Sequence, residues 1–193
     1  MDSQWRIARE DFSVFDPERE LDDVLARIRS RKIALVLRYW NSLRRGSRLP
    51  RRAEIDPAAI KSALPSVMIT SISYRPFRVL YRLVGTEIVQ WARVDFTNRY
   101  ADELIFDDSG RDWSTYYRAA VEARKPAYGL TDWLDQDRAP LWVELLICPL
   151  SEDGETIDRC LAVEDYEPMS DRDFAAIPPT GERRPWPVEK ASE

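Results

Sequence analysis

The chain has 193 residues, a length typical of one domain with extensions, and none of them is histidine. This composition excludes Ser-His-Asp and Cys-His nucleophile pairs, histidine-ligated metals and phosphorylated histidine. The 29 basic and 34 acidic residues give a net charge of −5, without the basic footprint of a nucleic-acid-binding domain. The sequence has no 18-residue apolar stretch and no apolar leader, so we expect a cytoplasmic protein without a membrane span.

The amino-terminal quarter predicts an arm followed by one long helix. Residues 1–19 are polar with isolated aromatic side chains, and we expect an arm that is ordered only where these side chains dock. Residues 20–48 lack proline and carry apolar residues at nearly heptad spacing, which predicts a single long helix. Its second half is apolar on a further face, which needs a second element or a second subunit. We expect this face to form a homodimer interface through Ile33, Val36, Leu37 and Trp40.

Residues 49–166 predict a single domain of mixed helices and strands. Asp56 and Pro57 are typical of a helix start, because Asp caps the first turn and Pro suits its first position. Asp153-Gly154 between two apolar runs indicates a hairpin. We predict strands at 66–74, 77–84, 127–134, 141–150 and 157–166, a short helix after Gly85 and a longer helix at 111–124.

This order of segments, two strands, a helical stretch and three strands, predicts an α+β fold with an antiparallel sheet. In the second strand, alternation places Val79, Tyr81 and Leu83 on one face, which we expect to be the inner face. After residue 166 the composition changes, since residues 167–193 hold five of the thirteen prolines. We therefore expect a Pro-rich C-terminal tail at 167–193.

Several short motifs resemble a PAS-like family of short bacterial proteins found mainly in alphaproteobacteria. They occur in the family's order over about residues 35–165, and they are LRYWNSL at 37–43, LPRRAEIDP at 49–57, LP at 64–65, VLYRLVGT at 79–86 and VDFT at 94–97. The resemblance implies a five-stranded antiparallel sheet of order 2-1-5-4-3 with a helical crossover. It also implies a sensory or protein-interaction role, with no catalytic residue to carry over. Asn98 stands where the family usually has Gly, and Asn also tolerates a left-handed turn.

A PAS-like sheet leaves a space beneath its crossover, and the chain supplies many aromatic residues to it. One reading is a pocket for a small apolar or aromatic ligand, oriented by tyrosine hydroxyls. The other is a core in which the same rings pack on one another. For the pocket, the predicted ligand-binding residues are Tyr81, Leu83, Trp91, Tyr100, Trp113, Tyr117, Tyr128 and Trp142.

The main functional hypothesis is a stand-alone regulatory module that acts on a separate signalling protein by contact, with or without a bound ligand, and is not an enzyme. The alternative is a small-molecule-binding enzyme or carrier that uses the aromatic pocket and loop carboxylates, for which the chain offers Asp107, Asp108, Asp112, Asp132, Asp135 and Asp137. No metal site is predicted. Glu144 lies within an apolar run, and the pattern leaves open whether its carboxyl is buried or faces outward.

The sequence does not identify the cofactor, but it argues against two common ones. A histidine-ligated haem lacks its ligand. Flavin photosensors carry Asn-Cys-Arg in the crossover, whereas Cys148 and Cys160 lie in the last two strands, which argues against a covalent flavin adduct. A two-residue Asp153-Gly154 turn would place the two thiols on opposite faces, and one further residue in the loop would place them opposite each other.

Overall fold

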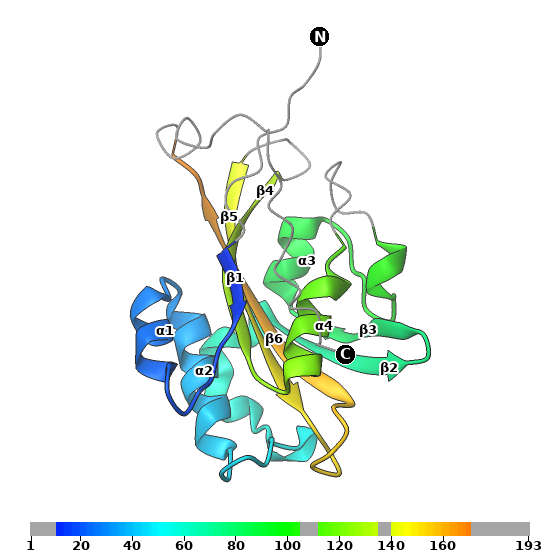
Figure 1. Ribbon diagram of the computed structural model, residues 1–193. Helices are drawn as coiled ribbons and strands as arrows, with labels where there is room; N and C mark the ends of the chain where they lie inside the picture. Colours follow the sequence, from blue (N-terminus) through cyan, green and yellow to red (C-terminus); the bar gives the residue numbers. More distant parts are fainter. Residues whose placement is uncertain (1–10, 105–111, 135–139, 171–193) are drawn as a thin grey trace, which may run out of the picture.

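The structure, a computed structural model, describes residues 11–104, 112–134 and 140–170. Its centre is one antiparallel sheet of six strands (Figure 1). In spatial order the strands are β1 (Asp11–Val14), β4 (Ala127–Leu134), β5 (Pro140–Leu150), β6 (Arg159–Pro168), β2 (Val67–Tyr74) and β3 (Phe77–Val84). The five predicted strands are therefore present in the predicted order.

The sixth strand, β1, corrects the prediction of a five-stranded sheet. It comes from the segment expected to be an arm, and it pairs with β4 along the edge of the sheet. The side chains of Phe12 and Phe15 are 6% and 3% exposed, so both aromatics dock in the core. Phe12 packs on Tyr116, with ring centroids 4.6 Å apart. Burial of these two rings explains why so short a polar segment holds an edge strand.

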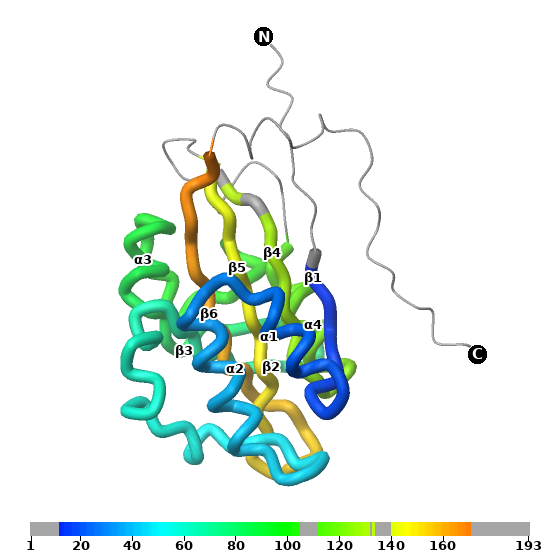
Figure 2. Tube along the Cα trace, turned by 90° about the vertical axis from the view of Figure 1, so that its left-hand side faces the viewer, coloured from blue at the N-terminus to red at the C-terminus, as the bar shows by residue number. Residues whose placement is uncertain are grey.

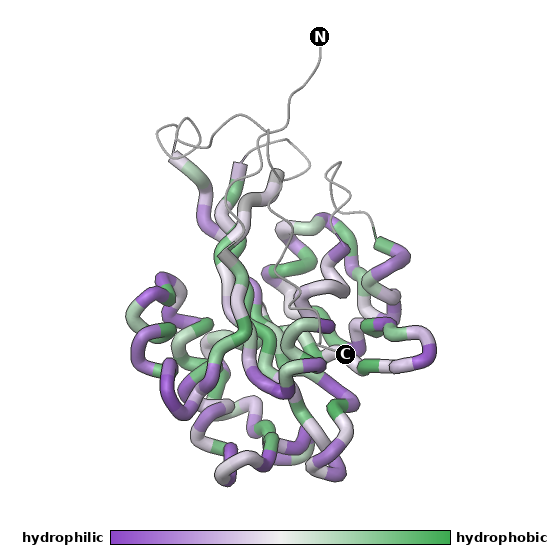
Figure 3. The backbone as a smooth tube through the Cα atoms, viewed as in Figure 1, coloured by the Kyte–Doolittle hydropathy of each residue, from purple (hydrophilic) through white to green (hydrophobic). Residues whose placement is uncertain are grey.

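Helices cover both faces of the sheet. On one face lie α1 (Leu21–Arg27) and α2 (Arg31–Leu43), which stand in front of the strands in Figure 2. On the other face lie α3 (Thr86–Ala92) and α4 (Ser114–Ala123) (Figure 1). Short 3-10 turns complete the fold at η1 (Arg52–Glu54), η2 (Pro57–Ser66) and η3 (Ala101–Glu103). The strands at the centre are mainly apolar, and the outer turns are mainly hydrophilic (Figure 3).

The predicted long helix over 20–48 is two helices, α1 and α2, separated by an extended break. At the break, the Ser30 hydroxyl caps α2 by accepting hydrogen bonds from the backbone N–H groups of Lys32 and Ile33, both at 3.2 Å. The carboxylate of Glu144 on β5 accepts the N–H groups of Arg29 and Ser30, both at 2.8 Å. These distant hydrogen bonds hold the chain out of the helix, and periodicity along the sequence does not reveal them.

The predicted homodimer face is buried in the protein's own core. Ile33, Val36, Leu37 and Trp40 each have 0% exposure. Trp40 donates its indole N–H to the carbonyl of Pro149 at 3.0 Å, because α2 packs on β5 and β6. The apolar face was predicted from helical spacing, but its partner is the sheet and not a second copy of the chain.

Two backbone features shape the crossover after β3: a left-handed residue at Asn98 and a close backbone approach at Gly85. Asn98 adopts the expected left-handed conformation with φ of +64°, and its N–H donates to the Tyr81 carbonyl at 2.7 Å. Gly85 begins the crossover against η2, where a Cβ atom would lie 2.2 Å from the Pro65 carbonyl oxygen. Only glycine permits this approach, which sets α3 against the sheet.

The two cysteines lie on opposite faces of the sheet. Cys148 is paired with Leu161, and Cys160 is paired with Pro149, so the side chains of the two cysteines alternate across the β5–β6 ladder. Both thiols are free and buried. The hairpin connection is longer than the predicted two-residue turn, but the resulting register still keeps the thiols apart.

A candidate ligand cavity beneath the crossover

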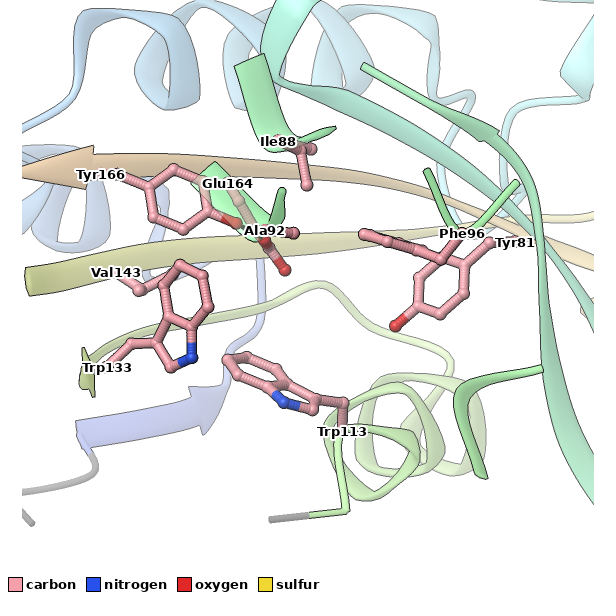
Figure 4. A pocket seen from close by; sticks show the side chains of 9 residues that line it. All are labelled: Tyr81, Ile88, Ala92, Phe96, Trp113, Trp133, Val143, Glu164 and Tyr166. Carbon is pink, nitrogen blue, oxygen red and sulfur yellow. Dashed lines mark hydrogen bonds between the residues drawn. The ribbon is translucent and has the colours of Figure 1, made fainter. Parts of the chain in front are cut away.

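A small cavity lies between the inner face of the sheet and α3 (Figure 4). Its volume is about 20 Å³, room for about one water molecule. The residues that line it come from β3, α3, the crossover, β4, β5 and β6, and they are Tyr81, Ile88, Ala92, Phe96, Trp113, Trp133, Val143, Glu164 and Tyr166. The space beneath the crossover is thus largely filled by side chains.

Aromatic rings do most of this filling. Tyr81 meets Phe96 edge-on, with centroids 4.7 Å apart. Tyr166 lies between two indoles, stacked on Trp91 at 5.6 Å and tilted against Trp133 at 5.7 Å. Such contacts stabilise the ring positions beyond simple burial. A ligand of flavin size would require these rings to move.

Among the described residues, Glu164 is the one acidic residue that lines the cavity. It is 9% exposed, and its carboxyl points among the aromatic rings (Figure 4). Burial raises the pKa of Glu164 to about 7, and a hydrogen bond from the Tyr166 hydroxyl opposes the rise. Glu164 therefore exchanges between its charged and neutral forms near neutral pH.

Trp133 contributes a second polar group to the residues that line the cavity. Its side chain is 6% exposed, and its indole nitrogen Nε1 has no hydrogen-bond partner among the described residues. In Figure 4 this nitrogen is on the side of the ring that faces the other lining residues. Buried donors without a partner are rare and cost about 1–3 kcal/mol, and a water molecule or another small guest in the cavity would satisfy this N–H.

Of the eight predicted ligand-binding residues, four lie at or next to the cavity. Tyr81 and Trp113 line it. Tyr117 is buried behind Tyr81, edge-on at 6.2 Å, and burial raises its pKa. Trp91 supports the wall by stacking on Tyr166.

The other four lie elsewhere. Tyr128 and Trp142 are on the opposite face, where Tyr128 donates to Glu144 and Arg29 lies 5.9 Å above the Trp142 ring. Tyr100 lies outside β3, with the Arg78 guanidinium 3.5 Å from its ring centroid. Leu83 is 44% exposed.

A β-bulge accounts for Leu83. Two consecutive residues of β2, Ile69 and Thr70, pair with Leu83 and Tyr81, so Arg82 is the extra residue of β3. The bulge turns Leu83 to the face opposite Tyr81. Strict alternation, which placed both side chains inside, fails at this point.

The predicted ligand-binding residues did not include Trp133, Glu164 or Tyr166. The signal was available, because Glu164 and Tyr166 are two residues apart in a predicted strand and therefore share a face. What the sequence did not show was which face of β6 lies under the crossover. The apolar run around Glu144 pointed to that glutamate instead. Glu144 is buried, with 5% exposure, but it lies on the other face of the sheet.

The described residues give no support to carboxylate catalysis. Asp112 accepts the N–H of Ser114 at 2.9 Å and so begins α4. Asp107, Asp108, Asp135 and Asp137 lie outside the described residues, as does the side chain of Asp132. Within the described ranges, no group of three or more acidic or cysteine side chains is placed to hold a metal ion.

The family model of the PAS domain matches residues 28–163. The chain belongs to the PAS domain family. No curated protein matches it. Among solved structures, it is similar to the LOV domain of a blue-light activated histidine kinase from Erythrobacter litoralis EL346, with 15% identity, a TM-score of 0.43 and coverage of 54% of this chain and 96% of that one.

It is also similar to the light state of the blue-light photoreceptor Aureochrome1 LOV, with 14% identity, a TM-score of 0.41 and coverage of 62% of this chain and 92% of that one. A third similar structure is an RNA-binding light-oxygen-voltage receptor, with 13% identity, a TM-score of 0.43 and coverage of 61% of this chain and 35% of that one. As for the membrane, none of the helices in the described part of this PAS domain is long and apolar enough to span one.

Proposed function

We propose that this PAS domain is a cytoplasmic regulatory module that acts on a partner protein by contact and is gated by a small, non-covalently bound ligand at Glu164. One observation carries the proposal: a buried carboxyl and a Trp133 N–H that has no partner among the described residues share a cavity in an otherwise filled aromatic core. Cores that serve stability alone pair their polar groups. Local departures from that rule are expected at functional sites.

A polar network offers a route from this cavity to the surface. Asp165 follows Glu164 on β6 and points to the other face, where it accepts hydrogen bonds from the Ser30 hydroxyl at 2.7 Å and the Lys32 ammonium at 3.0 Å. Lys32 also bonds Glu87 of α3 at 2.5 Å. The network thus joins β6 and α3, two walls of the cavity, to the start of α2.

The charge of Lys32 holds this network together. Burial disfavours the ammonium, but the hydrogen bonds that Lys32 donates to Glu87 and Asp165 outweigh burial and raise the pKa of Lys32. The Lys32 side chain is 28% exposed, so a partner protein has access to it. A shift of β6 or α3 on ligand binding would change the surface at this point.

The test compares partner capture by matched variants after crosslinking in the source cells. The wild type is compared with Trp133→Phe in the cavity and with Trp142→Phe on the opposite face. We expect a discrete captured protein whose yield changes at least several-fold in Trp133→Phe and not in Trp142→Phe. Equal yields from all three chains would overturn gating by the cavity. No captured protein above background would overturn action by contact.

A further inference from the structure

The cavity also indicates the chemical class of its ligand, an inference that rests on the proposed gating function. We infer that the ligand is a small neutral molecule with a hydroxyl group, which donates a hydrogen bond to Glu164 and accepts one from Trp133. Methanol is the simplest member of this class.

The hydrogen-bonding groups of the cavity require both a donor and an acceptor. One oxygen of Glu164 accepts the Tyr166 hydroxyl, and no other described residue donates to this carboxyl. Trp133 can only donate, and its N–H has no acceptor among the described residues. A hydroxyl group satisfies both because it carries one hydrogen and two lone pairs.

Ions fit the same groups less well. None of the nine lining residues is lysine or arginine, so an anion would meet the Glu164 carboxyl without a counter-charge. A small ammonium ion is the stronger competitor, because aromatic faces and a carboxylate attract cations. It has no lone pair, however, and would leave the Trp133 N–H unsatisfied.

The volume of the cavity and its apolar walls narrow the class of ligand further. A cavity of about 20 Å³ admits a group little larger than water unless the rings move. Its remaining walls are apolar, with Phe96, Ile88 and Val143 among them. With a small movement of the rings, a methyl group would contact these walls while the hydroxyl reaches Glu164.

The test follows the indole N–H resonance of Trp133 by NMR in the full chain, assigned with the Trp133→Phe variant. The protein is titrated with three probes of similar size and different charge: methanol, methylammonium chloride and sodium formate. The indole resonance of Trp142, on the opposite face, is the internal control. We expect methanol to shift Trp133 saturably, at least tenfold more tightly than either ion, and to leave Trp142 unchanged.

Two variants check the role of the carboxyl. Glu164→Leu should abolish the saturable shift, whereas Glu164→Gln, which retains an acceptor oxygen, should keep it and show that the fold tolerates substitution. Preferential saturation by methylammonium or formate would overturn the ligand class and leave gating intact. If every probe shifts the indole resonances of Trp133 and Trp142 equally, the cavity binds none of the probes. That result would overturn both the proposed ligand class and the proposed gating function.

Discussion

The two faces of the sheet each bury one glutamate, and the two sites are built in opposite ways. On the α2 face, Glu144 accepts two backbone N–H groups and the Tyr128 hydroxyl. On the crossover face, Glu164 accepts only the Tyr166 hydroxyl among the described residues and borders a cavity. Neighbouring strands of one sheet thus hold a fully satisfied carboxylate and a poorly satisfied one.

The difference separates a glutamate that serves the fold from one whose capacity to accept hydrogen bonds is largely unused among the described residues. Glu144 organises the break between α1 and α2, so its hydrogen bonds are part of the folded architecture. Glu164 organises no backbone that the structure describes, and its burial costs stability when it is charged. Since both are almost equally buried, burial alone does not separate the two roles, and the number of hydrogen-bond donors does.

The largest effect is expected from Glu144→Gln. The amide keeps one acceptor oxygen but turns an NH₂ group toward a backbone N–H, either that of Arg29 or that of Ser30. Loss of a charge-assisted hydrogen bond together with an unsatisfied buried donor should lower the free energy of unfolding by about 2–4 kcal/mol. Urea denaturation followed by circular dichroism measures this. A loss below about 0.5 kcal/mol would contradict the structural role of Glu144.

The corresponding substitution at the other site, Glu164→Gln, should raise the free energy of unfolding instead of lowering it. Burial raises the pKa of Glu164 from its ordinary value of 4.5 to about 7, so between these values the folded chain holds a proton that the unfolded chain has released. Its contribution to stability is therefore greatest below pH 4.5, falls as the pH rises to 7, and is constant above that.

Glu164→Gln removes this titration. We expect the variant to match the wild type near pH 4.5 and to exceed it at pH 8 by about 1–3 kcal/mol in the free energy of unfolding. Urea denaturation of both chains at the two pH values gives the difference, in which the titration of all other groups cancels. A difference that does not grow with pH would show that Glu164 is not desolvated.

The sequence predicted the parts of the fold that depend on local signals. The five PAS strands, the Asp56 cap and the left-handed turn at Asn98 all follow from patterns within a few residues, and the structure has each of them. The break between α1 and α2 depends on Glu144, more than 100 residues away in the sequence. An uninterrupted apolar periodicity therefore predicted one helix.

The site was predicted less well, because its members come from six separate segments. Tyr81 and Trp113 were identified as aromatic residues near the crossover, where the fold class alone places the cavity. Glu164 and Trp133 depend on which face of β6 and β4 lies beneath the crossover, and this is fixed by strand pairing. Tyr128 and Trp142 failed for the same reason, because aromatic composition does not specify a face.

The smallest expected effect tests the bulge that separates Leu83 from Tyr81. Leu83→Ala should change the free energy of unfolding by less than about 0.5 kcal/mol, because the side chain is 44% exposed on the opposite face of the sheet. The matched control is Val79→Ala, which removes fewer atoms from a site that is 1% exposed and should cost about 1–2 kcal/mol. Strict alternation would put both side chains in the core and make the larger truncation the costlier one. If urea denaturation gives a larger loss in the free energy of unfolding for Leu83→Ala than for Val79→Ala, the bulge is contradicted and Leu83 belongs on the cavity face.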